Sequence, residues 1–80
     1  GLVISLKRTD KMEENKISIF MEHTIHHNEH HAEDFINIAK DLRNAGADDA
    51  AELSESAAKD IESAVRKLVK AKELYEENFS

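Results

Sequence analysis

Apolar residues recur at intervals of three and four through most of this sequence, and that spacing leaves few folds open. Residues three and four apart lie one turn from each other on an α-helix, so the spacing indicates one continuous helical face. We predict a first helix over about residues 11–45. Its main buried stripe is expected to consist of Phe20, Thr24, His27, His31, Phe35, Ile38, Leu42 and Ala45. A second apolar column lies beside this stripe and comprises Ile25, Ala32, Ile36 and Ala39.

A turn is predicted at residues 46–48. Gly46 can take the left-handed conformation that ends a helix, and Asp49 can cap the next one. A connection this short makes the two helices antiparallel neighbours. The second helix is expected over about residues 50–78. Its stripe reads Leu53, Ala57, Ile61, Ala64, Leu68, Ala71 and Tyr75, broadened by Val65, Val69 and Phe79.

The fold class predicted from this pattern is all-α, an antiparallel two-helix hairpin over residues 10–80. Residues 1–9 do not show the helical pattern and are expected to form a flexible N-terminal arm or a vector-derived remnant. The apolar faces are wider than one partner helix can cover. We therefore expect two hairpins to associate as a homodimer that forms a four-helix bundle.

Composition excludes several classes of function. Cysteine is absent, so neither disulfides nor thiolate metal sites can form. The formal net charge of −6 argues against nucleic acid as a partner. No apolar run is long enough to span a membrane, and the basic start of a signal peptide is missing. We expect a cytoplasmic protein that is not an enzyme, because no catalytic motif is found and the Glu-x-x-His ligand pattern of di-iron bundles is missing.

All five histidines lie between residues 23 and 31. Imidazoles four residues apart on a helix can reach the same ion, and neutral imidazole suits divalent transition metals such as nickel and zinc. The predicted metal ligands are His23, His27 and His31. If residue i faces about residue 94 − i across the hairpin, Glu62 lies near His31. Secondary candidates are therefore His26, His30 and Glu62, with Asn28 in a supporting role.

Two other readings of the histidines stay open. His27 and His31 could be hydrogen-bonded core residues of a non-catalytic helical interaction module, with His26 and His30 solvated. Alternatively, stacked histidines could repel each other once protonated and make such a module responsive to pH.

The stretch from His23 to Phe35 resembles a pattern found in small archaeal and bacterial helical-hairpin domains, roughly His-Trp-Ile-Glu-His-Asn-x-x-His-Ala-x-x-Phe/Tyr. Thr24 replaces the tryptophan of that pattern, and His26 and His30 replace acidic positions. Some of these domains are attached to a small nickel-binding protein of carbon monoxide dehydrogenase maturation. The resemblance therefore implies nickel and a metalloenzyme-maturation partner. The positions that match the pattern are His23, His27, Asn28, His31, Ala32 and Phe35.

Overall fold

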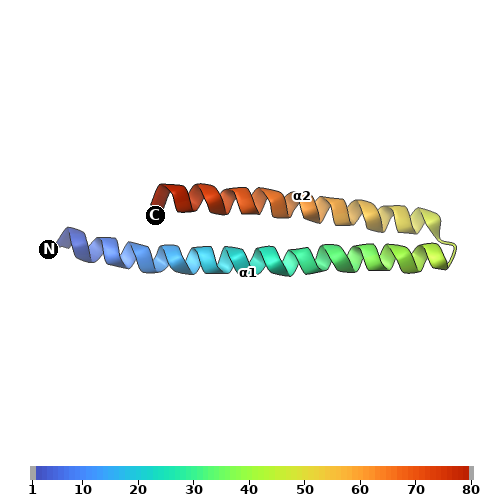
Figure 1. The fold of residues 1–80 in the computed structure, drawn as a ribbon, viewed down its shortest axis with the longest axis horizontal. Coiled ribbons are helices and arrows are strands. Elements are labelled where there is room, and N and C mark those ends of the chain that lie inside the picture. The colour runs from blue at the N-terminus through green and yellow to red at the C-terminus, as the bar shows by residue number, and fades with distance from the viewer. Residues whose placement is uncertain (1, 80) are drawn as a thin grey trace.

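The protein is an antiparallel pair of helices, as the sequence predicts. The computed structural model describes the backbone of residues 2–79 and the side chains of residues 15–78. Helix α1 spans Leu2–Asn44 and helix α2 spans Asp48–Phe79. They lie side by side and are joined at one end of the molecule (Figure 1), which measures 68 × 15 × 10 Å. Neither helix, over the described residues, has an apolar stretch that could cross a bilayer.

Helix α1 starts earlier than the sequence pattern predicts. It begins at Leu2 rather than near residue 11, so the segment expected to be a non-helical arm is helical from Leu2 onward. No proline or glycine occurs between Leu2 and Asn44 to stop a helix. The side chains of residues 2–14 lie outside the part of the structure described at that level.

The turn closes α1 in the manner expected from Gly46, which has a φ of 84°. The Gly46 N–H donates to the Arg43 carbonyl over 3.0 Å, and the Ala47 N–H donates to the Leu42 carbonyl over 2.8 Å. This pair of bonds is the Schellman arrangement, which satisfies carbonyls that the end of a helix leaves unpaired. Asp48 and Asp49 lie in the first turn of α2, where their charge complements the helix dipole.

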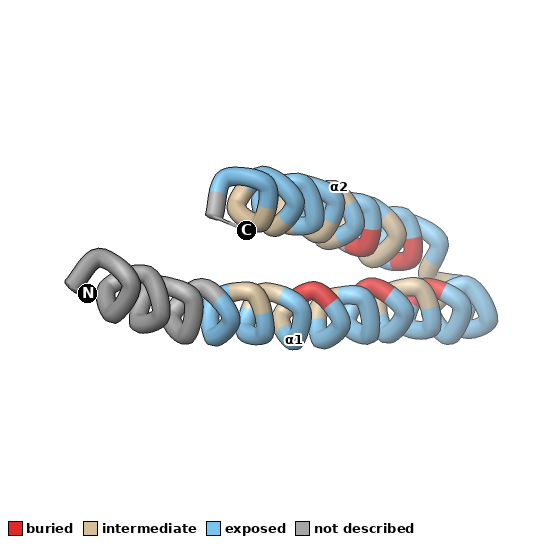
Figure 2. The backbone as a smooth tube through the Cα atoms, turned by 60° about the vertical axis from the view of Figure 1, so that its left-hand side comes forward, coloured by how far each residue is buried: buried red, intermediate tan, exposed pale blue. Residues whose placement is uncertain are grey.

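The two helices meet along an interhelical seam with heptad spacing. Figure 2 shows the buried positions on the facing sides of α1 and α2. Among the described side chains, the most buried are four alanines and Ile25, whereas the other large side chains of the seam are half-buried. Small side chains let two backbones approach closely, as in other alanine-rich contacts. The seam comprises Met21, Ile25, Asn28, Ala32, Phe35, Ala39 and Leu42 of α1 with Ala51, Ser54, Ala58, Ile61, Val65, Leu68, Lys72 and Tyr75 of α2.

Polar contacts cross the seam at both ends. Near the turn, Arg43 Nη2 lies 2.6 Å from Glu55 Oε1, and this hydrogen-bonded pairing lowers the pKa of the Glu55 carboxyl. Toward the open end, Lys72 Nζ lies 3.4 Å from Glu22 Oε2 and 3.0 Å from Glu76 Oε2. These charges are screened by solvent, so they fix the register of the helices more than they add stability.

A hydrogen bond from a serine hydroxyl joins the two helices in the half of the hairpin nearer the turn. Ser54 Oγ donates to the Phe35 carbonyl oxygen over 2.7 Å, in a part-buried position. A backbone carbonyl of α1 thereby accepts a bond from α2 in addition to its helical one.

The main stripe predicted from the sequence is only partly buried: Phe35 and Leu42 lie in the seam, but other members do not. Phe20 and Ile38 are exposed, and so are His27 and His31. On α2 the exposed side chain of Leu53 corrects the prediction in the same way, as do the exposed Ala64 and Ala71. The second column of α1, with Ile25, Ala32 and Ala39, supplies the seam instead. The sizes of the apolar residues do not identify the buried side of each helix, because alanines occupy most of the most buried positions.

Candidate metal centre

His27 and His31 form the closest pair within the predicted histidine column. Their Nε2 atoms lie 2.9 Å apart, and their ring centroids are 4.4 Å apart with the planes at 86°. They project from α1 one turn apart, as their four-residue spacing requires. Without a metal, one Nε2–H can donate to the other Nε2, so the two rings can hydrogen-bond to each other. Both residues are exposed, so they are not the core residues of the alternative interpretation.

His23 stands beside this pair without joining it. Its ring is stacked on that of His27, with centroids 6.2 Å apart and an interplanar angle of 17°. Among the described side chains, no group of three or more histidine, aspartate or glutamate residues is arranged to hold a metal ion. The column therefore supplies two convergent nitrogen atoms from one chain, whereas protein zinc sites use three or four ligands.

The two Nε2 atoms are close enough for both to reach one ion. Metal–imidazole bonds are about 2.0–2.1 Å long, so two ligands of one ion are about 2.9–3.3 Å apart. The observed 2.9 Å falls in this range, and it is equally the length of a hydrogen bond between the two rings.

Asp34 is the carboxylate beside this pair. Its Oδ2 lies 3.8 Å from His31 Nδ1, somewhat beyond hydrogen-bonding distance. A carboxylate on the Nδ1 side favours the tautomer that leaves Nε2 free as a ligand. The sequence interpretation overlooked Asp34, although its position three residues after His31 places it on the same face of the helix.

The secondary candidates His26 and His30 are engaged with acidic neighbours. His26 Nε2 lies 3.0 Å from Glu22 Oε1, and His30 Nδ1 lies 3.9 Å from Glu33 Oε2. Both histidines are exposed. No ring contact between them is found, in contrast to the pair formed by His27 and His31.

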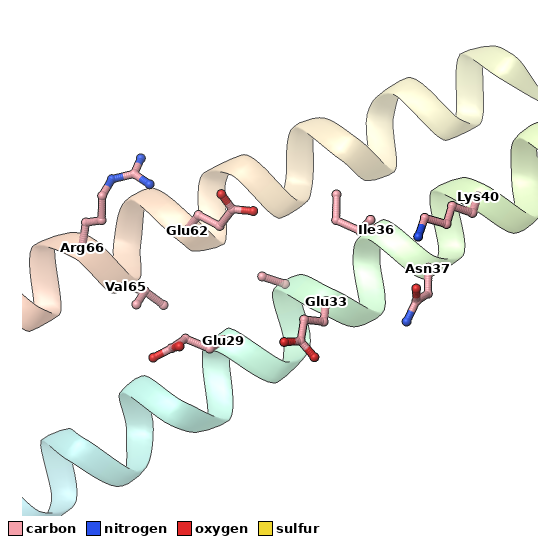
Figure 3. A pocket seen from close by; sticks show the side chains of 9 residues that line it. Glu29, Glu33, Ile36, Asn37, Lys40, Glu62, Val65 and Arg66 are labelled. Atoms are coloured by element: carbon pink, nitrogen blue, oxygen red, sulfur yellow. The ribbon is translucent and has the colours of Figure 1, made fainter.

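Glu62 lies away from the histidine pair. It lines an open groove of about 700 Å³ on one side of the seam, together with Glu29, Glu33 and Arg66. Figure 3 shows these side chains extending from the two helices around that groove. A helix turns by about 100° per residue, which places His31, one residue before the seam residue Ala32, on the opposite side from Glu29. The prediction that Glu62 approaches His31 is therefore wrong.

Asn28 is a seam residue that bonds within its own helix. Its Nδ2 donates to the Thr24 carbonyl over 2.8 Å. The amide therefore stabilises a part-buried polar position, and the contacts observed do not include the orienting bond to a histidine that was predicted for it.

One known protein family matches most of this hairpin. The family described as "Domain of unknown function (DUF8180)" matches residues 17–75. The chain belongs to this family. The matched segment contains all five histidines, the turn and most of α2. No curated protein and no solved structure matches the chain.

Proposed function

We propose that this protein binds a divalent transition metal, nickel or zinc, through His27 and His31, with His23 next to them. The observation that carries the proposal is the 2.9 Å separation of two exposed Nε2 atoms. No catalytic role is assigned, and reversible binding would serve delivery, storage or sensing of the metal.

The sequence resemblance adds a biological setting to this proposal. The column of His23, His27 and His31 matches the histidines of hairpin domains attached to a nickel-binding protein of carbon monoxide dehydrogenase maturation. A cytoplasmic role beside a metalloenzyme-maturation partner is consistent with that resemblance and with the absence of cysteine. The match between the pattern and this chain supports nickel as the first metal to test.

Calorimetric titration of the chelator-stripped protein with nickel and with zinc tests the proposal. We expect saturable binding near pH 7.5 that is strongly weakened near pH 5.5, because only deprotonated imidazole is a ligand. The double variant His27→Gln, His31→Gln should abolish it, and His23→Gln should weaken it.

The matched control is the double variant His26→Gln, His30→Gln. It removes two histidines at the same spacing from the neighbouring column, where His26 is paired with Glu22. Metal affinity should be retained in this control. Affinity that survives the change of His23, His27 and His31 together would exclude the proposed ligands.

A second candidate function is a helical oligomerisation module, in which the histidines are structural or respond to pH. The exposure of Phe20 at 69% and Leu53 at 74% favours association with another protein surface. We propose a homodimer of hairpins that forms a four-helix bundle. A single species of monomer mass in sedimentation equilibrium at micromolar concentration would exclude the bundle.

A further inference from the structure

One side of the hairpin combines the histidine pair with most of the large apolar side chains that are exposed among residues 15–78. The groove and the Arg43–Glu55 pair occupy the other side. Residues just before the first seam position of each heptad, such as His31 before Ala32 and Ala57 before Ala58, therefore share the side opposite the groove. We call this side the histidine–alanine face; it comprises Phe20, Thr24, His27, His31, Asp34 and Ile38 of α1 with Leu53, Ala57, Asp60, Ala64, Lys67, Ala71 and Leu74 of α2.

The register of the hairpin places His31 level with Ala64. Lys72 contacts Glu22 across the seam, and at the next turn the nearby Ser18 hydroxyl lowers the pKa of Glu76. Counting along both helices from these contacts brings His31 beside Ser63 and Ala64. Apolar side chains lie toward both ends of the face, and the histidine pair lies near its middle.

We propose that a second copy of this chain packs antiparallel on the histidine–alanine face, with its two-fold axis at the level of His31 and Ala64. In this arrangement α1 packs on the partner's α1, and α2 on the partner's α2. Two positions face each other when their distances from the axis, on opposite sides, agree to within one residue, which is about 1.5 Å along a helix. Ala57 and Ala71 are each seven residues from Ala64, so alanine meets alanine along α2. Such contacts let the helices approach closely.

The charges on the face are complementary under the same symmetry. Asp60 precedes Ala64 by four residues and Lys67 follows it by three, so Asp60 lies opposite the partner's Lys67. The two-fold symmetry gives two such pairs in each dimer. By the same count, His27 meets the partner's Asp34, and Leu53 meets the partner's Leu74. Polar and apolar positions are thus both matched.

A parallel dimer of the same faces is disfavoured by these residues. It would stack α1 on the partner's α2 at equal height, where Asp34 lies level with Asp60 and His27 with Lys67. Asp34 would then oppose the partner's Asp60, twice in each dimer. These carboxylates placed against each other suppress that arrangement.

The antiparallel dimer completes the metal centre, an inference that rests on the proposed function. One chain supplies only the two convergent Nε2 atoms of His27 and His31. The axis at His31 brings the partner's His31 level with His31, whereas His27 and the partner's His27 lie about 6 Å from the axis on opposite sides. The partner's His31 can therefore add a third imidazole to the pair formed by His27 and His31, and such a site uses both His31 side chains. We therefore expect one metal ion for every two chains.

Disulfide trapping tests the arrangement without any metal. Ala64→Cys lies on the axis and should cross-link to itself under mild oxidation in the presence of chelator. Ala57→Cys alone and Ala71→Cys alone should not cross-link, whereas an equimolar mixture of the two should. The parallel arrangement predicts no cross-link at Ala64→Cys, because α2 would face the partner's α1, and that result would overturn the proposal.

Charge reversal provides a second test, which needs no introduced cysteine. Asp60→Lys or Lys67→Asp should raise the dimer dissociation constant about tenfold, since each change creates two like-charged contacts. The double variant Asp60→Lys, Lys67→Asp restores opposite charges and should restore the wild-type constant in sedimentation equilibrium. A double variant no tighter than the singles would contradict the register.

Nickel titration of the wild-type dimer then separates the two proposals. One ion per two chains, with Ala64→Cys cross-linking, supports the composite site. One ion per chain, held equally well by monomer, overturns the composite site and leaves the metal function in place. Cross-linking without saturable nickel binding retains the antiparallel dimer and removes the metal function together with the composite site.

Discussion

Replacing an isoleucine with alanine at two positions of α1 should distinguish the seam from the exposed surface of that helix. Ile25 is 4% exposed and Ile19 is 69% exposed. The change removes three methylene-sized groups, worth about 2.4 kcal/mol at full burial. The better helix propensity of alanine offsets about 0.4 kcal/mol of that loss. Ile25→Ala should therefore lower the free energy of unfolding by about 2 kcal/mol, and Ile19→Ala by about 0.3 kcal/mol.

Thermal unfolding followed by circular dichroism measures this difference. At about 4–8 °C per kcal/mol for a domain of this size, Ile25→Ala should melt about 8–16 °C below the wild type and Ile19→Ala within about 3 °C of it. All variants are compared at one protein concentration, because association would shift each midpoint. Equal shifts at the two positions would refute the assignment of Ile25 to the seam. A larger shift for Phe20→Ala than for Ile25→Ala would restore the stripe expected from the sequence.

Three further predictions concern the turn and the polar contacts. Gly46→Ala should cost about 1–2 kcal/mol in urea unfolding, because the φ of 84° strains any residue with a Cβ although the space around Gly46 is open, and Gly46→Asn should cost less. Pairing with Arg43 lowers the pKa of the Glu55 carboxyl. The stabilisation from this pair is therefore complete above the ordinary glutamate pKa and is lost as the pH falls through the lowered pKa. Glu55→Gln should accordingly reduce the loss of stability at acidic pH in a stability–pH curve. Ser54→Ala removes the bond to the Phe35 carbonyl and should cost about 1 kcal/mol, and a stability unchanged in urea would show that this bond contributes nothing.

The hairpin and its turn follow directly from local features of the sequence. Gly46 takes the positive φ predicted for it, and the short connection makes the helices antiparallel. These features are predictable because helix periodicity and a left-handed glycine are properties of neighbouring residues. The early start of α1 was missed because a helix can continue through residues that show no amphipathic pattern.

The rotation of each helix about its axis could not be predicted as reliably. Two adjacent apolar columns on α1 offered two possible faces, and side-chain size favoured the one with Phe20 and Ile38. The seam instead uses Ile25 with small residues such as Ala32 and Ala58, which bury little area each but allow close packing. This choice moved His27 and His31 from the expected core to an exposed side and placed Glu62 on the other side.

A single short connection also implies an order in which the contacts form. Arg43 and Glu55, beside the turn, close a loop about one quarter as long as the loop closed by Glu22 and Lys72 at the open end. Each doubling of loop length adds about 0.6 kcal/mol of closure entropy, so the distal contact costs about 1.2 kcal/mol more if it forms first. The helices are therefore expected to zip together from Gly46 outward and to fray from the opposite end. Amide hydrogen exchange should become faster with distance from the turn. His27 and His31 lie about halfway between the turn and the open end, so their amides should exchange at intermediate rates.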